Sequence, residues 1–228
     1  MASMSTRVAG SIEDLIGDAA AQGITGDARM DRAVACAAAL FLENRIADVR
    51  MTDVAEKAGI GVATLYRRFS TKGRLALAAG TLLWRRFNER ITDLVESDAF
   101  LAMGGANRLE RMLRLYAEGY VENAGFVLFI DDLDRLLVSE RMDEEALGAY
   151  AGEVDSFYLI FADAYQLGLQ DGSVVRKVDF PLFYRSVAHA LMGASQKLAR
   201  GEVIPSDDFS RAADELECIV DMAVRALR

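Results

Sequence analysis

Residues 52–75 of this chain read TDVAEKAGIGVATLYRRFSTKGRL, and they contain two short amphipathic segments joined by a tight, glycine-containing turn. Thr52 offers an N-cap oxygen, Asp53 places a negative charge in the first turn, and Gly59 is typical of a helix end. After a two-residue connection, hydrophobic periodicity predicts a second helix over residues 62–69. Two short helices joined in this way form the helix-turn-helix pattern.

The second of these helices has two different faces. At about 100° per residue, Leu65 and Phe69 share one side, which we expect to be buried against neighbouring helices. The opposite side carries short or polar residues, so it fits a major groove about 12 Å wide. DNA contacts are therefore predicted from Thr52, Val62, Ala63, Thr64, Tyr66, Arg67 and Lys72.

Different contacts follow from the chemistry of these side chains. Thr64 or Arg67 would reach base edges, whereas Tyr66 would donate to phosphate. Lys72, at the start of the next helix, would add a phosphate contact assisted by the amide groups there. Simple packing is the alternative interpretation, since helix pairs in all-helical proteins usually serve the core.

The distribution of charge supports contact with a polyanion. The chain as a whole carries a net charge of -9, but residues 29–90 hold 12 Lys and Arg against 6 Asp and Glu. Residues 91–228 hold 13 against 25. A basic module thus precedes an acidic body, and such asymmetry is a sign of nucleic-acid binding.

The remaining sequence predicts an all-α protein. Of its 228 residues 52% are hydrophobic and only 2 are Pro, and no apolar run is long enough for a membrane span or a signal peptide, so we expect a cytoplasmic protein. Three parts are predicted: a flexible N-terminal extension (1–28), a helix-turn-helix DNA-binding domain (29–75) and a larger helical domain for ligand binding and dimerisation (76–228). Beyond residues 52–69, helices are predicted over 30–43, from 70 or 71 to about 97, and over 107–123, 126–138, 144–170, 180–200 and 207–227, the last capped by Ser206.

No catalytic constellation is visible in the sequence. Neither a Ser-His-acid or Cys-His arrangement, nor a metal-binding cluster, nor a glycine-rich phosphate loop occurs, so we expect no enzyme activity, no cofactor and no metal. The acidic run Asp131, Asp132 and Asp134 could hold a cationic ligand or a metal, but a solvated helix face is the preferred interpretation.

The helix-turn-helix stretch resembles the signature of the TetR family of bacterial transcriptional repressors. The resemblance covers residues 29–75, and Gly61 and Gly73 depart from it, where a serine and an acidic residue are usual. The matching positions are Phe41, Thr52, Val54, Ala55, Ala58, Gly59, Thr64, Leu65, Tyr66, Phe69 and Lys72. This resemblance implies a homodimer that binds double-stranded DNA and a small-molecule pocket in the helical body.

Two groups of residues in the body fit these expectations. Heptad-like spacing in the last two predicted helices indicates a four-helix dimer interface, although the same seams could face their own subunit's core. The predicted interface residues are Tyr184, Val187, Leu191, Leu198, Leu216, Ile219 and Ala223. Large adaptable side chains in the central helices suit an apolar or aromatic effector, although any one of them could be ordinary core. The predicted effector-binding residues are Met112, Tyr116, Tyr120, Phe126, Phe129, Phe157, Phe161 and Tyr165.

The sequence therefore predicts a ligand-responsive, dimeric transcriptional regulator, most simply a repressor, that binds a near-palindromic operator. The alternative is a helical protein-binding adaptor that retains a vestigial helix-turn-helix.

Overall fold

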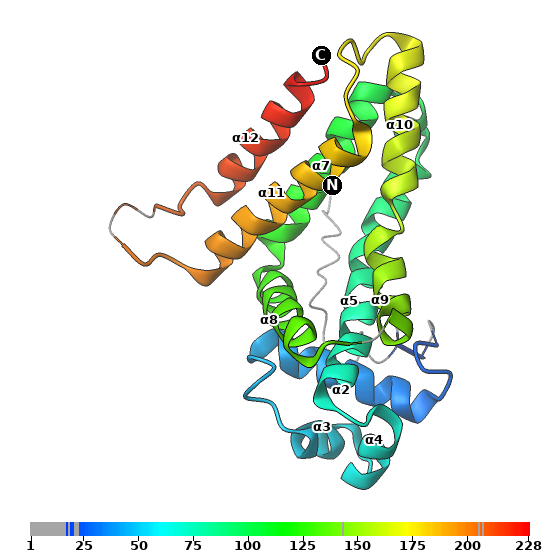
Figure 1. Cartoon of the computed structure of the whole chain (residues 1–228), viewed down its shortest axis with the longest axis vertical. Helices are drawn as coiled ribbons and strands as arrows, with labels where there is room; N and C mark the ends of the chain where they lie inside the picture. Colours follow the sequence, from blue (N-terminus) through cyan, green and yellow to red (C-terminus); the bar gives the residue numbers. More distant parts are fainter. Residues whose placement is uncertain (1–16, 18, 21–22, 143, 205, 207) are drawn as a thin grey trace. The chain divides into compact units, whose positions relative to one another are not determined.

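The computed structural model describes residues 17, 19–20, 23–142, 144–204, 206 and 208–228 (Figure 1). All the regular elements in these residues are helices, so the predicted all-α class is confirmed. None of the helices formed by the described residues is both long and apolar enough to cross a membrane. The helices are α2 (Ala28–Glu43), α3 (Met51–Ala58), α4 (Val62–Phe69), α5 (Lys72–Val95), α6 (Asp98–Leu101), α7 (Gly105–Glu122), α8 (Ala124–Glu140), α9 (Glu144–Asp155), α10 (Tyr158–Asp171), α11 (Phe180–Arg200) and α12 (Ala212–Arg225).

The chain forms two compact units. The first contains residues up to Phe87 together with Leu128–Val154, and the second contains Asn88–Val127 together with Asp155–Arg228. Helices α2, α3 and α4 thus share a unit with most of α8 and with α9. The predicted domain boundary after residue 75 stays a prediction, and most of the predicted extension (1–28) lies outside the described residues.

Helix α2 begins two residues earlier than the hydrophobic pattern predicted. The carboxylate of Asp27 accepts hydrogen bonds from the backbone N–H groups of Arg29 (2.8 Å) and Met30 (3.3 Å), so it caps the helix. Along its inner face α2 is apolar, and the ring of Phe41 stacks on that of Phe129 from α8 with 5.9 Å between centroids. The contact joins the start of the chain to a helix almost ninety residues later.

Asp132 of α8 also holds the first unit together. Its carboxylate accepts the backbone N–H of Ile46 at 2.8 Å and the guanidinium of Arg45 at 3.1 Å. Of the acidic run that it belongs to, Asp131 pairs with Arg135 at 2.9 Å. Asp132 therefore makes a specific contact with the α2–α3 linker. Neither of the two interpretations of the acidic run, a solvated face or a cation site, included this contact.

Two of the helices predicted in the body are wrong, and one short helix was not predicted. The segment 144–170 is two helices, because the chain turns at Ser156, whose hydroxyl accepts a hydrogen bond from the side chain of Asn88 at 3.2 Å. The last helix starts at Ala212 and not at residue 207, so Ser206 does not cap it; instead Asp208 accepts the N–H of Ser210 in a turn before the helix. The short helix α6 was missed.

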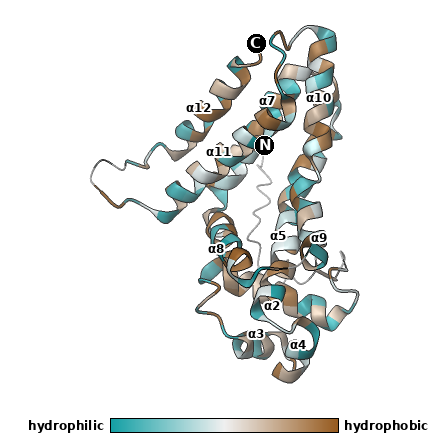
Figure 2. Ribbon diagram, in the orientation of Figure 1, coloured by the Kyte–Doolittle hydropathy of each residue, from teal (hydrophilic) through white to brown (hydrophobic). Residues whose placement is uncertain are grey.

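Helix α7 is the centre of the second unit, where it packs against α10, α11 and α12. Figure 2 shows hydrophobic and hydrophilic residues alternating around these helices, as expected for amphipathic packing. Where α7 crosses α10, a Cβ on Gly105 would overlap backbone atoms of Ala164 and Gly168. The N–H of Gly105 also donates to Asp171 at 2.8 Å, so the end of α10 caps the start of α7.

Substitution of Gly105 by alanine should destabilise the protein by about 1–3 kcal/mol, because the added methyl group meets rigid backbone and not a movable side chain. Gly152, in α9, is the matched control: its Cβ position is open, so Gly152→Ala should stabilise by up to about 1 kcal/mol. Urea unfolding at one fixed protein concentration measures both. Equal stability of the two variants would contradict the close crossing.

Candidate nucleic-acid interface

The start of α3 differs from the predicted one. Thr52 does not cap this helix, which begins at Met51 with Arg50 as the N-cap residue. The carboxylate of Asp53 accepts the backbone N–H of Arg50 at 3.0 Å, and this bond lowers the pKa of Asp53. Thr52 lies exposed in the first turn, so its side chain is accessible for the predicted DNA contact.

The turn between α3 and α4 follows the sequence prediction. Gly59 ends α3 in the left-handed conformation with φ 70°, which glycine adopts without strain. The N–H of Ile60 then donates to the carbonyl of Ala55 at 3.0 Å, which closes the helix end. Gly61 occupies the N-cap position of α4 without a side-chain hydrogen bond.

The two predicted faces of α4 are confirmed by burial. Leu65 and Phe69 are buried, with 0% and 6% of their surface exposed. On the other side Ala63 and Arg67 are exposed, and 49% of the surface of Tyr66 is exposed. The remaining predicted residues of the helix are Val62, which is exposed, and Thr64, which is half-buried. Helix α4 therefore presents a short, polar surface that could enter a major groove.

Lys72 has a structural role that the motif did not indicate. Its ammonium group donates to the backbone carbonyls of Ala47 at 2.9 Å and Val49 at 3.0 Å. These bonds tie the start of α5 to the linker between α2 and α3. Its predicted contact with phosphate stays a prediction.

A basic hollow of about 230 Å³ adjoins the exposed side of α4. Arg68 on its wall donates to the carbonyl of Thr25 at 3.1 Å, and its guanidinium lies 5.8 Å from the centre of the Phe69 ring. Arg29 also lines it, although nothing in the sequence places the start of α2 beside α4. The lining residues are Asp27, Arg29, Met30, Thr64, Arg67 and Arg68. Three arginines around one concave surface suit an anion such as a DNA phosphate.

The predicted effector residues do not all come together. Phe129 lies in the first unit against Phe41, whereas the other seven belong to the second unit. Of these seven, all except Tyr116 are buried. The aromatic residues of α7 and α10 join those of α11 in one continuous cluster, which contains Tyr116, Tyr120, Phe161, Tyr165, Tyr158, Phe180 and Tyr184.

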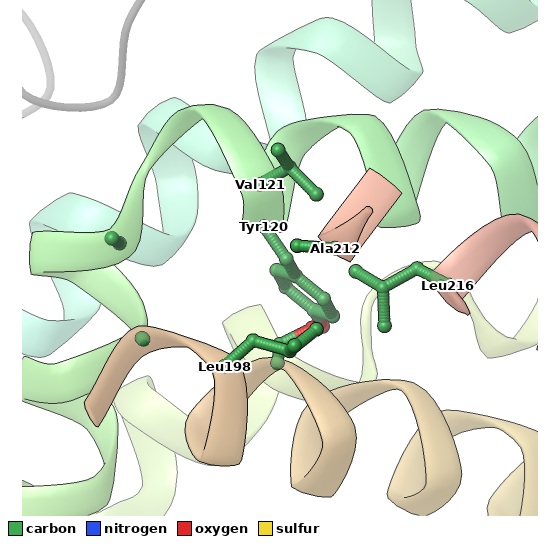
Figure 3. Close-up of a pocket in the computed structure, with 8 residues that line it drawn as sticks. Tyr120, Val121, Leu198, Ala212 and Leu216 are labelled. Carbon is green, nitrogen blue, oxygen red and sulfur yellow. The ribbon is translucent and has the colours of Figure 1, made fainter. Parts of the chain in front are cut away.

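The rings of this cluster contact one another directly. The rings of Tyr165 and Phe180 stack with 4.7 Å between centroids, and those of Tyr116 and Phe161 lie 5.9 Å apart. Burial raises the pKa of Tyr116 and raises that of Tyr184 to about 12. Tyr120 also lines a separate cavity between α7, α11 and α12 (Figure 3).

The heptad seams of α11 and α12 point into their own subunit. Val187, Leu191, Leu216 and Ala223 are buried in the single chain, and the ring of Tyr184 packs on that of Phe161 at 5.3 Å. The other two, Leu198 and Ile219, are half-buried. The faces left open carry mainly small or polar residues and include Leu182, Ser186, His189, Ala190, Gly193, Cys218 and Met222.

Helices α3 and α4 are joined by a tight turn, and α4 has an exposed polar face. In an all-helical chain, this arrangement defines the helix-turn-helix class of transcription regulator. Residues 34–79 match the family model of bacterial regulatory proteins of the tetR family, which confirms the resemblance. Residues 34–79, which include α3 and α4, are thus similar to the DNA-binding helix-turn-helix segment of that family.

Comparison of the whole chain with solved structures shows the same fold. A bacterial regulatory protein of the tetR family from Rhodococcus RHA1 is 18% identical with a TM-score of 0.61, covering 87% of this chain and 96% of that one. The ketosteroid transcriptional regulator KstR2 of Mycobacterium tuberculosis is 17% identical with a TM-score of 0.58, covering 89% and 96%. The fatty acid degradation regulator FadR from Bacillus halodurans is 13% identical with a TM-score of 0.54, covering 83% and 93%. No curated protein matches the chain significantly in sequence.

Replacing Lys72 by methionine should lower the free energy of unfolding by about 1–3 kcal/mol without any DNA present, because two backbone carbonyls lose a charged donor. Lys57→Met is the control, since Lys57 lies exposed on α3 and its loss should change stability by less than about 0.5 kcal/mol. Urea unfolding of the purified variants gives both values. If the two variants are equally stable, the bonds of Lys72 to the linker contribute nothing to the stability of the fold.

Proposed function

We propose that this chain is a homodimeric transcriptional repressor that acts in the cytoplasm, binds a near-palindromic operator through α4, and is released by a small apolar or aromatic effector. The observation that carries this proposal is the division of α4 into a buried side, Leu65 and Phe69, and an exposed side with Tyr66 and Arg67. The basic hollow beside that exposed side supports contact with the DNA backbone.

A dimer is needed because one recognition helix reads only a few base pairs. The open faces of α11 and α12 are the surface that we propose for it. Ala190 and Gly193 there are small enough to let a second pair of helices approach closely, while Leu182 and Met222 expose 56% and 59% of their surface and provide apolar contacts.

The apolar character of the effector is supported by the second unit, whose interior is rich in aromatic side chains. Two solved proteins with this fold have names that refer to a ketosteroid and to fatty acid degradation, which are likewise apolar chemistries. In our proposal, occupation of the second unit alters the spacing of the two α4 helices in the dimer, and DNA is released.

Selection of bound duplexes from a random library should enrich a two-fold symmetric site. With that site as probe, Arg67→Ala should weaken binding by about 1–3 kcal/mol and relax the sequence preference at the base that Arg67 contacts. Tyr66→Phe should instead weaken binding to all DNA sequences by the same amount. Arg176→Ala, which removes an exposed arginine of the second unit, is the control and should leave binding unchanged. Gel shift over a range of salt measures all three. A wild-type protein that shifts no duplex even at low salt would instead support the protein-binding adaptor.

Met222→Glu should convert the dimer into monomers, because it places a charge in the proposed apolar contact between subunits. Leu159→Glu is matched to it, since Leu159 is 69% exposed on α10 in the same unit but outside the proposed interface. Sedimentation velocity of both variants and the wild type measures the association. Retention of the dimer by Met222→Glu would place the interface elsewhere.

A further inference from the structure

The second unit contains a cavity of about 100 Å³ at the ends of three helices. Its walls come from the last turn of α7 and the residues that follow it, from the C-terminal part of α11 and from the start of α12 (Figure 3). The lining residues are Tyr120, Val121, Ala124, Ser195, Leu198, Ala199, Ala212 and Leu216. None of these side chains is charged, and hydroxyl groups occur on Tyr120 and Ser195.

Ser195 is the unusual member of this set. Its side chain is buried, with 3% of its surface exposed, and its hydroxyl oxygen has no hydrogen-bond partner among the described residues. A buried hydroxyl is normally bonded, and a serine inside a helix usually donates to the carbonyl four residues earlier. A hydroxyl without a partner on the wall of a cavity is therefore suited to bind a polar group that enters it.

The other walls define what else the occupant must be. The Tyr120 ring lies between Leu198 and Leu216 in Figure 3, and such apolar walls favour hydrocarbon. A charged molecule is disfavoured, because no lining side chain could compensate its loss of hydration. A cavity of about 150 Å³ holds a benzene molecule, so the volume of 100 Å³ corresponds to roughly five non-hydrogen atoms.

We propose that this cavity binds a small neutral compound, or the end of a longer one, with an aliphatic body and one hydroxyl or carbonyl group that hydrogen-bonds to Ser195. The site is distinct from the aromatic cluster, whose rings pack against one another. It lies between α11 and α12, whose open faces carry the proposed dimer interface, so an occupant would influence the spacing of these two helices. As an effector site it rests on the proposed function, but binding itself does not.

The test uses the full-length protein without DNA and 1-butanol as the probe, with pentane as a hydroxyl-free compound of equal size and butyrate as a charged one. Saturation-transfer NMR should show binding of 1-butanol and of pentane, and no binding of butyrate. Ser195→Ala keeps the cavity but removes its hydroxyl, so 1-butanol affinity should fall at least about fivefold while pentane affinity stays the same. Ala212→Leu, which fills the cavity, should abolish binding of both.

Ser139→Ala is the matched control, because Ser139 is exposed on α8 in the first unit and its loss should leave affinity unchanged. Equal 1-butanol affinity of the wild type and Ser195→Ala would overturn the proposal, and so would the absence of any binding to the wild type. Thermal unfolding of each variant shows whether it is folded. Since no DNA is present, failure here leaves the operator experiment unaffected, and a protein that binds no operator could still bind 1-butanol.

Discussion

The linker between α2 and α3 is held from both sides by two half-buried charged residues, and the arrangement of the helix-turn-helix depends on these contacts. Asp132 accepts the backbone N–H of Ile46, while Lys72 donates to the carbonyls of Ala47 and Val49. An irregular segment exposes donors and acceptors that need partners when it packs against a core. A carboxylate for the N–H and an ammonium for the carbonyls are strong partners, because charged groups form the stronger hydrogen bonds.

Helix α8, which contains Asp132, also completes the apolar core beneath the helix-turn-helix. Phe129 lies three residues earlier, on the same face of α8, and stacks on Phe41. Residues 128–154 belong to the first unit, so part of the core beneath α2 comes from a segment far along the sequence. With α2 and its linker fixed in this way, Leu65 and Phe69 have a defined surface to pack against. The exposed side of α4 is a consequence of that packing.

Features that depend on neighbouring residues could be predicted from the sequence, whereas those that depend on distant ones could not. The turn at Gly59 and the two faces of α4 follow from local conformation and periodicity, and both are confirmed. Asp132 was interpreted as part of a solvated face or a cation site, because its partners lie 86 and 87 residues away. The sequence likewise placed Phe129 in the effector region, because its partner Phe41 is distant in the sequence. Apolar spacing predicts that a side chain is buried, but it does not identify the residues against which the side chain packs.

The seams of α11 and α12 show a further limit of periodicity, because a heptad pattern marks the most hydrophobic side of a helix and not the partner that covers it. A helix covered on two sides places its larger apolar residues against its own core, here Val187 and Leu191. The side left exposed is the less hydrophobic one, with Ala190 and Gly193, and it is where we propose that a second subunit packs. Small residues weaken the sequence signal of an interface, yet they are what lets two helix pairs approach closely. Under our proposal, the surface between subunits therefore lies opposite the heptad seam and not along it.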